Sequence, residues 1–391
     1  MIRAVFIYMD NSYLQELINE AKARDGGLIL NLNGRPEVVV LTVEKYNQLI
    51  SESANQRLSE QADQANSFKP KTILVTGGAG YIGSHLTREL LKQGHKVVVL
   101  DNLSSGKREN VPDEAVFVEG DLADVNLLRD LFAANNFDAV MHMAASIEVE
   151  ESVNNPQKYF ENNAVNTAKL LSVMNEANVK KIIFSSTCAV FGDQAGELFG
   201  ETAPVKPNNP YGFSKAMAEK SIKYYCQFVG FDAAVLRYFN AGGSSLEAEI
   251  KPTHVSHLLP IIFEVAAGLR PYITINGNDY QTPDGTCVRD FVHVLDIAGA
   301  HLKALDYLAS HSGFHIFNIG TGSGASVLQM INATAEVLNK MIPMEIGPRR
   351  AGDAAMLIAD NSKMVNELGY RLEYSDLPTI ISSSWAQFIR E

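Results

Sequence analysis

The feature that most constrains the fold is a glycine-rich stretch, TGGAGYIG, in which Gly77, Gly80 and Gly83 recur at every third position. The apolar run TILVT precedes it and is typical of a buried strand, and LTRELLKQG follows with the apolar spacing of a helix. Glycines at such a strand-to-helix turn allow a tight turn, a close approach of a ligand to the backbone, and close packing of the helix on the strand. The stretch therefore predicts a βαβ unit whose turn faces a bound group.

The alternation of strands and helices continues along the chain. Further strands are predicted at KVVVL, AVFVEGD, FDAVMHMAA, KKIIFSS and AAVLRYFN, with helical runs between most of them. This pattern makes parallel sheets that are covered by helices on both faces. We therefore predict an α/β fold, with a Rossmann-like doubly wound parallel sheet over residues 70–240.

The two ends of the chain differ from this pattern. After about residue 241 loops rich in Pro, Gly and His take over, with helices predicted near 294–309, 326–340 and 377–390. Residues 241–391 are predicted to form a smaller C-terminal α/β substrate-binding domain. Residues 1–50 predict a small α+β appendage, with a helix at NSYLQELINEAKA and a hairpin of GLILNLN and EVVVLT about Asn33-Gly34. The polar residues 51–69 are predicted to be a linker.

An acidic residue accompanies the glycine loop. Backbone N–H groups and the positive end of a helix favour phosphates, so the loop is a candidate site for a pyrophosphate. Asp101 ends the strand KVVVL, where a carboxylate can accept hydrogen bonds from both hydroxyls of an adenosine ribose and would repel a 2′-phosphate. Asp121 is a further candidate near the adenine. The pattern predicts NAD rather than NADP, and the alternative is a tight turn and helix cap without a ligand.

Composition narrows the classes of partner. The formal net charge is −12 without a basic block, so nucleic acid and anionic membrane surfaces are poor default partners. No apolar run approaches the ~20 residues that span a bilayer, and the start of the chain lacks the apolar core of a signal peptide. Cys188, Cys226 and Cys287 show no metal-ligand or disulfide pattern. We predict a cytoplasmic protein.

The stretch NPYGFSK contains a candidate catalytic pair. Pro210 suits the first turn of a helix, and Tyr211 and Lys215 then share one helix face at positions i and i+4. The strand KKIIFSS brings Thr187 to the carboxyl edge of the sheet, where ligands of such sheets bind. A positive charge from Lys215 and from a nicotinamide would lower the pKa of Tyr211 and make it a base. The alternative for the pair alone is ordinary helix surface.

The arrangement of a strand-end hydroxyl and Tyr-x-x-x-Lys in such a sheet resembles the short-chain dehydrogenase/reductases. From about residue 71 to the end, the chain resembles the UDP-glucose 4-epimerase family of extended members, through motifs that include TGGAGYIGSH, VVVLDNLSSGKRENV, FSSTCAVFG, NPYGFSKAMAE, LRYFNAGG, TPDGTCVRDFVHV and RRAGD. The resemblance implies interconversion of UDP-glucose and UDP-galactose with a tightly held NAD, in a homodimer. It implies that Tyr211 takes the proton of the sugar's 4-hydroxyl. It also implies that a 4-keto sugar rotates between two hydride transfers and so presents its other face.

The resemblance also implies two sets of binding residues. The set implied for NAD is Gly77, Gly80, Tyr81, Ile82, Gly83, Asp101, Asn102, Asp121, Leu122, Asn162, Tyr211, Lys215 and Tyr238. The set implied for the nucleotide sugar is Thr187, Tyr211, Asn240, Leu258, Arg289, Arg350, Asp353 and Leu357. The two arginines also make independent sense, because a diphosphate needs charged donors that an acidic chain must supply locally; each alone is more often a surface ion pair.

Some positions depart from the commonest family pattern. Asn276 stands where the family has apolar bulk, and Glu148 and Glu150 stand where small neutral residues are frequent. Leu357 matches the position that controls access of N-acetyl groups, and its intermediate size leaves UDP-N-acetylhexosamines open as alternative substrates. The family's dehydratases place acidic residues after the strand-end hydroxyl, whereas Cys188 follows here, which disfavours a dehydratase.

Two further interpretations concern metals and the first 69 residues. His254, His257 and His293 fit no trusted zinc spacing, so no metal site is predicted. Residues 1–69 resemble the Phd-type antitoxin family, whose members dimerise and bind DNA. Here they carry seven Lys or Arg and nine Asp or Glu, a net charge of −2, which favours a dimerisation or partner-binding role. A regulatory nucleotide-sugar sensor is the alternative function from another class.

Overall fold

The computed structural model describes residues 27–32, 35–41, 69–194, 198–247, 250, 258–350 and 354–389. The chain separates into two compact units, Met1–Lys69 and Pro70–Glu391. In the first, strands β1 (Gly27–Leu32) and β2 (Arg35–Leu41) pair antiparallel, which confirms the two strands of the predicted hairpin. The predicted helix of this unit and residues 51–68 lie outside the described residues, and the unit's resemblance to antitoxins stays a prediction.

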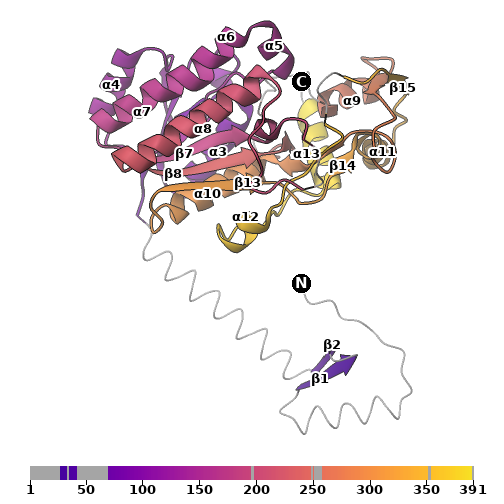
Figure 1. Ribbon diagram of the computed structural model, residues 1–391. Helices are drawn as coiled ribbons and strands as arrows, with labels where there is room; N and C mark the ends of the chain where they lie inside the picture. Colours follow the sequence, from indigo (N-terminus) through magenta and orange to yellow (C-terminus); the bar gives the residue numbers. More distant parts are fainter. Residues whose placement is uncertain are drawn as a thin grey trace. The chain divides into compact units, whose positions relative to one another are not determined.

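The second unit is built on a seven-stranded parallel sheet with the order β13-β8-β7-β6-β3-β4-β5 (Figure 1). The predicted doubly wound α/β fold is therefore confirmed. Its strands are β3 (Thr72–Thr76), β4 (Lys96–Asp101), β5 (Val116–Glu119), β6 (Ala139–His142), β7 (Lys181–Thr187), β8 (Asp232–Tyr238) and β13 (Phe314–Ile319). Chain order reverses between β3 and β6, and such a switch point is where ligands bind in this class of sheet.

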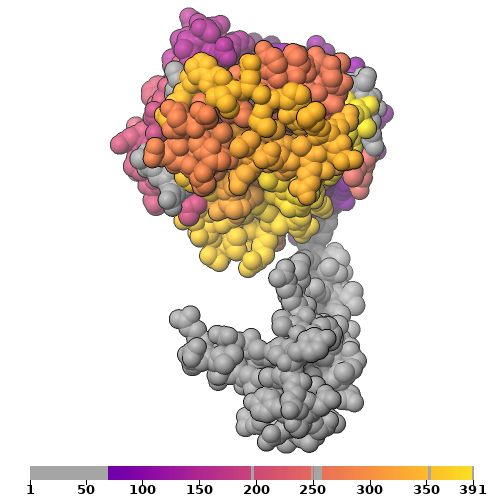
Figure 2. Space-filling model, turned by 90° about the vertical axis from the view of Figure 1, so that its right-hand side faces the viewer, coloured from indigo at the N-terminus to yellow at the C-terminus, as the bar shows by residue number. Residues whose placement is uncertain are grey.

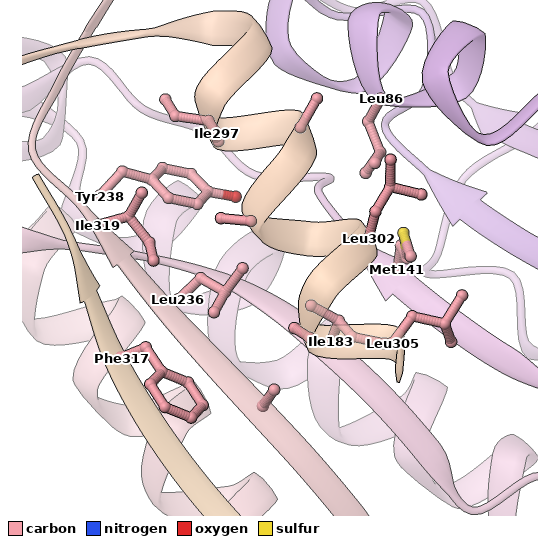
Figure 3. Packing of buried hydrophobic residues seen from close by; sticks show 14 of the residues in the cluster. Leu86, Met141, Ile183, Leu236, Tyr238, Ile297, Leu302, Leu305, Phe317 and Ile319 are labelled. Atoms are coloured by element: carbon pink, nitrogen blue, oxygen red, sulfur yellow. The ribbon is translucent and has the colours of Figure 1, made fainter. Parts of the chain in front are cut away.

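Apolar residues that alternate along the strands create two cores. Ile73 and Val75 of β3 join one cluster, and Leu74 joins the other. Figure 3 shows the first cluster, in which Leu302 and Leu305 of helix α10 lie over the sheet. Helices α3 (Tyr81–Lys92) and α10 (Val294–Tyr307) cover this face. Helices α4 (Val125–Ala134), α7 (Asn166–Glu176) and α8 (Pro210–Val229) cover the other.

One strand of the sheet and one helix that packs on it come from beyond residue 241. β13 pairs with β8, and α10 packs on the sheet, although both follow the predicted substrate-binding region's start. Periodicity could not show this, because the six residues of β13 stand among loops. Phe314 of β13 pairs with Ala233 of β8, which lies 81 residues earlier in the chain. The boundary at 240/241 thus remains a prediction.

Most of the remaining elements form a smaller layer around a third apolar cluster, in which the Trp385 ring stacks on that of Phe388 and meets the Phe263 ring edge-on. Residues coloured orange and yellow in Figure 2, from this part of the chain, make up most of one face of the unit. The predicted C-terminal helices are confirmed as α10, α11 and α13. The elements are α9 (Leu258–Ala266), β10 (Ile273–Asn276), β11 (Val288–Arg289), β12 (Phe291–His293), β14 (Ala325–Ser326), α11 (Val327–Leu338), β15 (Met344–Gly347), β16 (Met356–Leu357) and α13 (Leu377–Phe388). Helix α12 (Ser362–Asn366) instead places Met364 in the first cluster.

Candidate active site

A cavity of about 610 Å³ lies at the carboxyl ends of the parallel strands. Residues from the glycine loop line one end, and residues from the smaller layer line the other. The structure brings together every predicted site residue except Asp353, which lies outside the described residues. Those that line the cavity are Gly77, Gly80, Tyr81, Ile82, Gly83, Asp101, Asn102, Asp121, Leu122, Asn162, Thr187, Tyr211, Lys215, Tyr238, Asn240, Leu258, Arg289, Arg350 and Leu357.

The glycine loop is a cradle of backbone atoms. Gly77 has φ +73°, and a Cβ there would lie 2.6 Å from the backbone nitrogen of Ala144. A Cβ on Gly83 would lie 2.1 Å from the carbonyl oxygen of Gly77. A Cβ on Gly80 would meet only that oxygen, at 3.4 Å. Gly77 and Gly83 are therefore required by the protein's own packing, whereas Gly80 keeps the cavity side of the loop open at the start of α3.

The carboxylates of Asp101 and Asp121 line the end of the cavity where the adenosine ribose is predicted to bind. Asp101 ends β4, is 8% exposed, and accepts backbone hydrogen bonds from Ala79 at 2.9 Å and Leu103 at 2.9 Å. Burial raises the pKa of Asp101 above its ordinary value. Asn102 donates to Asp121 at 2.6 Å, which ties the ends of β4 and β5 together. The Asp101 carboxylate, as an acceptor, and the bare backbone at Gly80 fit a dinucleotide with a free 2′-hydroxyl.

The catalytic helix begins as the sequence predicts. Pro210 occupies its first turn, and the side chain of Asn209 caps it by accepting from the backbone nitrogen of Gly212 at 2.8 Å. Tyr211 and Lys215 follow on one face and both line the cavity, with Lys215 only 2% exposed. The Lys215 Nζ lies 4.6 Å from the centroid of the Phe184 ring. The predicted juxtaposition of the pair with the strand end is therefore present.

The predicted lowering of the Tyr211 pKa is not produced by the protein's own groups. Burial raises the pKa of Tyr211 to about 12, and the negative charge of Glu148 acts in the same direction. A hydrogen bond with Thr187 opposes this rise. Burial also lowers the pKa of Lys215 to about 7, which the charge of Glu219 opposes. Desolvation thus dominates both groups, because Lys215 is buried away from water and Tyr211 is only partly exposed.

The far end of the cavity carries the two predicted arginines. Arg289 of β11 donates to the carbonyl oxygens of Val288 and Ala354 at 2.9 and 2.8 Å. Leu357 of β16 stands opposite it in register and is 9% exposed. Arg350 is half exposed, and its Nη2 lies 3.4 Å from Glu150 of helix α5 (Val149–Asn154).

The three positions that depart from the family pattern, Glu148, Glu150 and Asn276, lie in different surroundings. Glu150 accepts a hydrogen bond from Arg350, so this acidic residue contacts a side chain that is predicted to bind the substrate. Glu148 occupies the position before helix α5 without capping it through its side chain, and its charge raises the pKa of Tyr211. Asn276 is exposed at the end of β10 and is not among the cavity's lining residues.

Sequence reasoning missed a buried network behind the site. Arg237 and Glu219 form an ion pair at 2.7 Å, and Ser186 donates to the same carboxylate. Their spacing along the chain carries no motif that indicates a contact. His293, one of the predicted non-ligands, accepts from the backbone nitrogen of Leu295 and contacts Ser383. Within the part of the chain that the structure describes, no cluster of three or more potential metal ligands occurs, and none of the helices is long and apolar enough to cross a membrane. His254 and His257 lie outside it.

Three comparisons place the chain among known proteins. A model of the NAD dependent epimerase/dehydratase family matches residues 73–320. A UDP-glucose 4-epimerase of Lacticaseibacillus casei is 44% identical over 80% of this chain and 96% of its own length.

Solved structures agree with these matches. A UDP-glucose 4-epimerase from Brucella ovis in complex with NAD is 39% identical, with a TM-score of 0.78 over 81% of this chain and 98% of its own. The UDP-Glc/GlcNAc 4-epimerase from Campylobacter jejuni is 42% identical, with a TM-score of 0.73 over 82% of this chain and 100% of its own. With the glycine loop, Asp101 and the Tyr211–Lys215 pair at one cavity, the chain belongs to the NAD dependent epimerase/dehydratase family.

Proposed function

We propose that the chain is a UDP-glucose 4-epimerase, which interconverts UDP-galactose and UDP-glucose through a 4-keto sugar. The observation that carries the proposal is that one cavity joins the loop of Gly80 and Asp101 to Tyr211 and then to Arg289 and Arg350. A dinucleotide at the first end and a nucleotide sugar at the other would meet at the tyrosine. The relatives named UDP-glucose 4-epimerase supply the reaction.

The cofactor is NAD, in keeping with the family. When bound, NAD would supply hydride chemistry at carbon 4 of the sugar, with removal from one face and return to the other. The glycine loop would hold its pyrophosphate at the N-terminus of α3, and Asp101 its adenosine ribose. In this proposal Asn162 and Tyr238 line the part of the cavity next to Tyr211.

Tyr211 is the proposed acid and base. Its phenolate oxygen takes the proton of the sugar's 4-hydroxyl as the carbon–oxygen double bond forms, and returns it when the carbon is reduced again. Because burial holds the pKa of Tyr211 at about 12 in the protein alone, the phenolate depends on positive charge beside it. Lys215, one helical turn away, is the charge that the chain supplies, and Thr187 donates the hydrogen bond that stabilises the phenolate.

The nucleotide end is proposed to anchor the substrate. Arg289 and Arg350 would hold the diphosphate, with Asn240 and Leu258 beside the nucleotide and Asp353 as a further ligand. Tight binding at the UDP leaves the sugar free to turn and present its other face. Glu150 competes for Arg350 at 3.4 Å, so diphosphate binding must replace this exposed ion pair.

The test is to incubate the purified chain with UDP-galactose, without added cofactor, and to follow UDP-glucose by NMR. We expect UDP-glucose to form until an equilibrium mixture is reached, with no net consumption of NAD. Absence of product, even after NAD is added, would refute the proposal for these substrates. A Tyr211→Phe variant is the matched control, since it keeps the ring and removes the hydroxyl.

A second candidate substrate is a UDP-N-acetylhexosamine. Leu357 lines the cavity opposite Arg289, and one solved relative is a UDP-Glc/GlcNAc 4-epimerase. Leucine is smaller than the aromatic residues that would block an acetamido group. A parallel incubation with UDP-N-acetylgalactosamine decides this: product together with UDP-glucose indicates dual specificity, and none indicates that Leu357 excludes the group.

We propose a homodimer that pairs through helix α8. Phe213, Met217, Tyr224 and Phe228 of this helix are 40–69% exposed and follow one another at helical spacing on one face. An apolar stripe of this kind is typical of a covered surface. Sedimentation of the wild type against Phe228→Ser is the test, and an unchanged dimer would refute this interface.

We also propose a cytoplasmic location and a dimerisation or partner-binding role for residues 1–69. The first rests on Cys188, Cys226 and Cys287, which are all free thiols. The second is tested by comparing the sedimentation of the full chain with that of residues 70–391. An identical oligomer would exclude a dimerisation role for the appendage, and retention on DNA at physiological salt would favour the regulatory alternative.

A further inference from the structure

A charged network is completely buried behind the catalytic helix. The Arg237 Nε donates to Glu219 Oε1 at 2.9 Å and its Nη2 donates to Oε2 at 2.7 Å, with the two side chains 2% and 7% exposed. Ser186 donates to the same carboxylate, and Arg237 Nη1 reaches the carbonyl oxygen of Glu201 at 3.4 Å. The Arg237 guanidinium also lies 5.2 Å from the centre of the Phe191 ring. Each polar group of the pair therefore has a partner.

Each member of the network is tied to a residue of the proposed active site. Glu219 is four residues after Lys215 on α8, and the two therefore lie on the same helix face. Ser186 is followed directly by Thr187 at the end of β7. Arg237 is followed directly by Tyr238 at the end of β8. The network thus joins the three elements that carry the site.

Burial of such a pair is seldom favourable for stability alone. Removing two charges from water costs free energy that their attraction only partly returns, and apolar residues of similar volume are often as stable. Buried charges at this position therefore call for a role that apolar residues would not supply.

We propose that Glu219, held by Arg237 and Ser186, is a positioning residue that fixes the catalytic helix on the strand ends and keeps Lys215 protonated beside Tyr211. This inference rests on the proposed epimerase function. Glu219 itself does not line the cavity and acts through Lys215.

The groups that face Lys215 support a charge-setting role. On its own helix these are Tyr211, whose pKa burial raises, and Glu219, whose negative charge raises the pKa of Lys215. On β6, His142 is bonded to two threonine hydroxyls and burial lowers its pKa to about 3, so it is neutral. On β7 the Phe184 ring lies below the ammonium. On β8 Arg237 is engaged with Glu219. The carboxylate of Glu219 is the negative charge in this set.

The sign of the effect follows from these groups. Burial lowers the pKa of Lys215 to about 7, and removal of the Glu219 charge lowers it further. Lys215 would then lose its proton at a lower pH, and with it the charge that favours the Tyr211 phenolate. Activity that depends on protonated Lys215 must therefore fall at a lower pH in the variant than in the wild type.

The experiment measures the pH dependence of kcat for UDP-galactose in three variants of the NAD-loaded enzyme. In Glu219→Gln we expect the alkaline decline to move by about one pH unit or more toward acid, so that kcat at pH 8 falls by about tenfold or more. Glu219→Asp keeps the charge and changes the position, so it should lose kcat without moving the decline. Glu176→Gln, which removes the carboxylate of the exposed Arg129–Glu176 pair, is the control and should leave the profile unchanged.

The alternative is a purely structural pair. A Glu219→Gln variant that unfolds at a lower temperature but keeps the wild-type kcat and pH profile would overturn the proposal. If that variant does not fold, Ser186→Ala removes one hydrogen bond that holds the Glu219 carboxylate and keeps both charges, and a wild-type kcat in this variant would overturn the positioning role. Wild-type enzyme that makes no UDP-glucose would instead refute the proposed function, so the two failures are distinct.

Discussion

Gly83→Ala and Gly80→Ala should impair the protein in different ways: the first should lower its stability, and the second should weaken its binding of NAD. A Cβ on Gly83 would lie 2.1 Å from the carbonyl oxygen of Gly77 and 2.9 Å from the Cα of Gly78, both backbone atoms that no side-chain rotation can move. Opening the turn to relieve this overlap costs about 3 kcal/mol, and the better helix propensity of alanine returns about 1 kcal/mol. A net loss of about 2 kcal/mol corresponds to a decrease in Tm of about 3 °C in a unit of this size.

Gly80 is the matched comparison within the same loop. Its φ of −77° suits alanine, and a Cβ there would meet only the Gly77 oxygen at an ordinary 3.4 Å. Gly80→Ala should therefore keep the stability of the wild type within about 0.5 kcal/mol. The new methyl group stands on the cavity side of the loop, where the pyrophosphate is proposed to approach. NAD affinity should fall by about tenfold or more, equivalent to about 1.4 kcal/mol.

Thermal unfolding of nucleotide-free protein and calorimetric titration with NAD separate the two effects. Gly83→Ala should lower the Tm, whereas Gly80→Ala should leave the Tm unchanged and weaken NAD. A Gly83→Ala variant as stable as the wild type would refute the steric argument. A Gly80→Ala variant that binds NAD normally would refute the assignment of the loop to the pyrophosphate.

Three further predictions concern the site. Tyr211→Phe should lower kcat by about 10²–10⁴-fold while NAD content, measured by absorbance after denaturation, is retained. Lys215→Met should raise the Tm of nucleotide-free protein at pH 7 and below, because the wild type there buries the charge of Lys215, whose pKa is lowered from 10.5 to about 7. The gain in Tm should shrink as the pH rises from 7 to 10.5, and a constant gain across this range would contradict the prediction. Glu150→Gln should lower the KM for UDP-galactose by at most severalfold, because it frees Arg350 from an exposed ion pair worth about 0–1 kcal/mol, and an increased KM would contradict the competition.

The sheet was predictable because its signals are local. TILVT, the glycine loop and the following helix lie within 24 residues of one another, and their apolar periodicity and turn chemistry agree. Pro210 and the capping Asn209 likewise define the start of α8 from four consecutive residues. The strand β13 was missed, because its place in the sheet depends on pairing with β8 across a long connection.

The electrostatics of the site were not predictable from spacing. Tyr211 and Lys215 are on one helix face in the sequence pattern, but the direction of their pKa shifts depends on burial, which no spacing reveals. The pair of Arg237 and Glu219 joins a strand to a helix 18 residues away and has no motif. Residues that meet only through tertiary packing are therefore the part of the site that the structure adds.

The central claim is that hydrogen leaves carbon 4 of the sugar and returns to the same carbon within the cavity that Tyr211 lines. The most direct measurement is to incubate the enzyme in ordinary water with UDP-galactose that carries deuterium at carbon 4, and to locate the label in UDP-glucose by NMR. The account predicts that the deuterium is retained at carbon 4 of the product. Loss of the deuterium to solvent would contradict it, because the hydrogen would then have been exchanged as a proton.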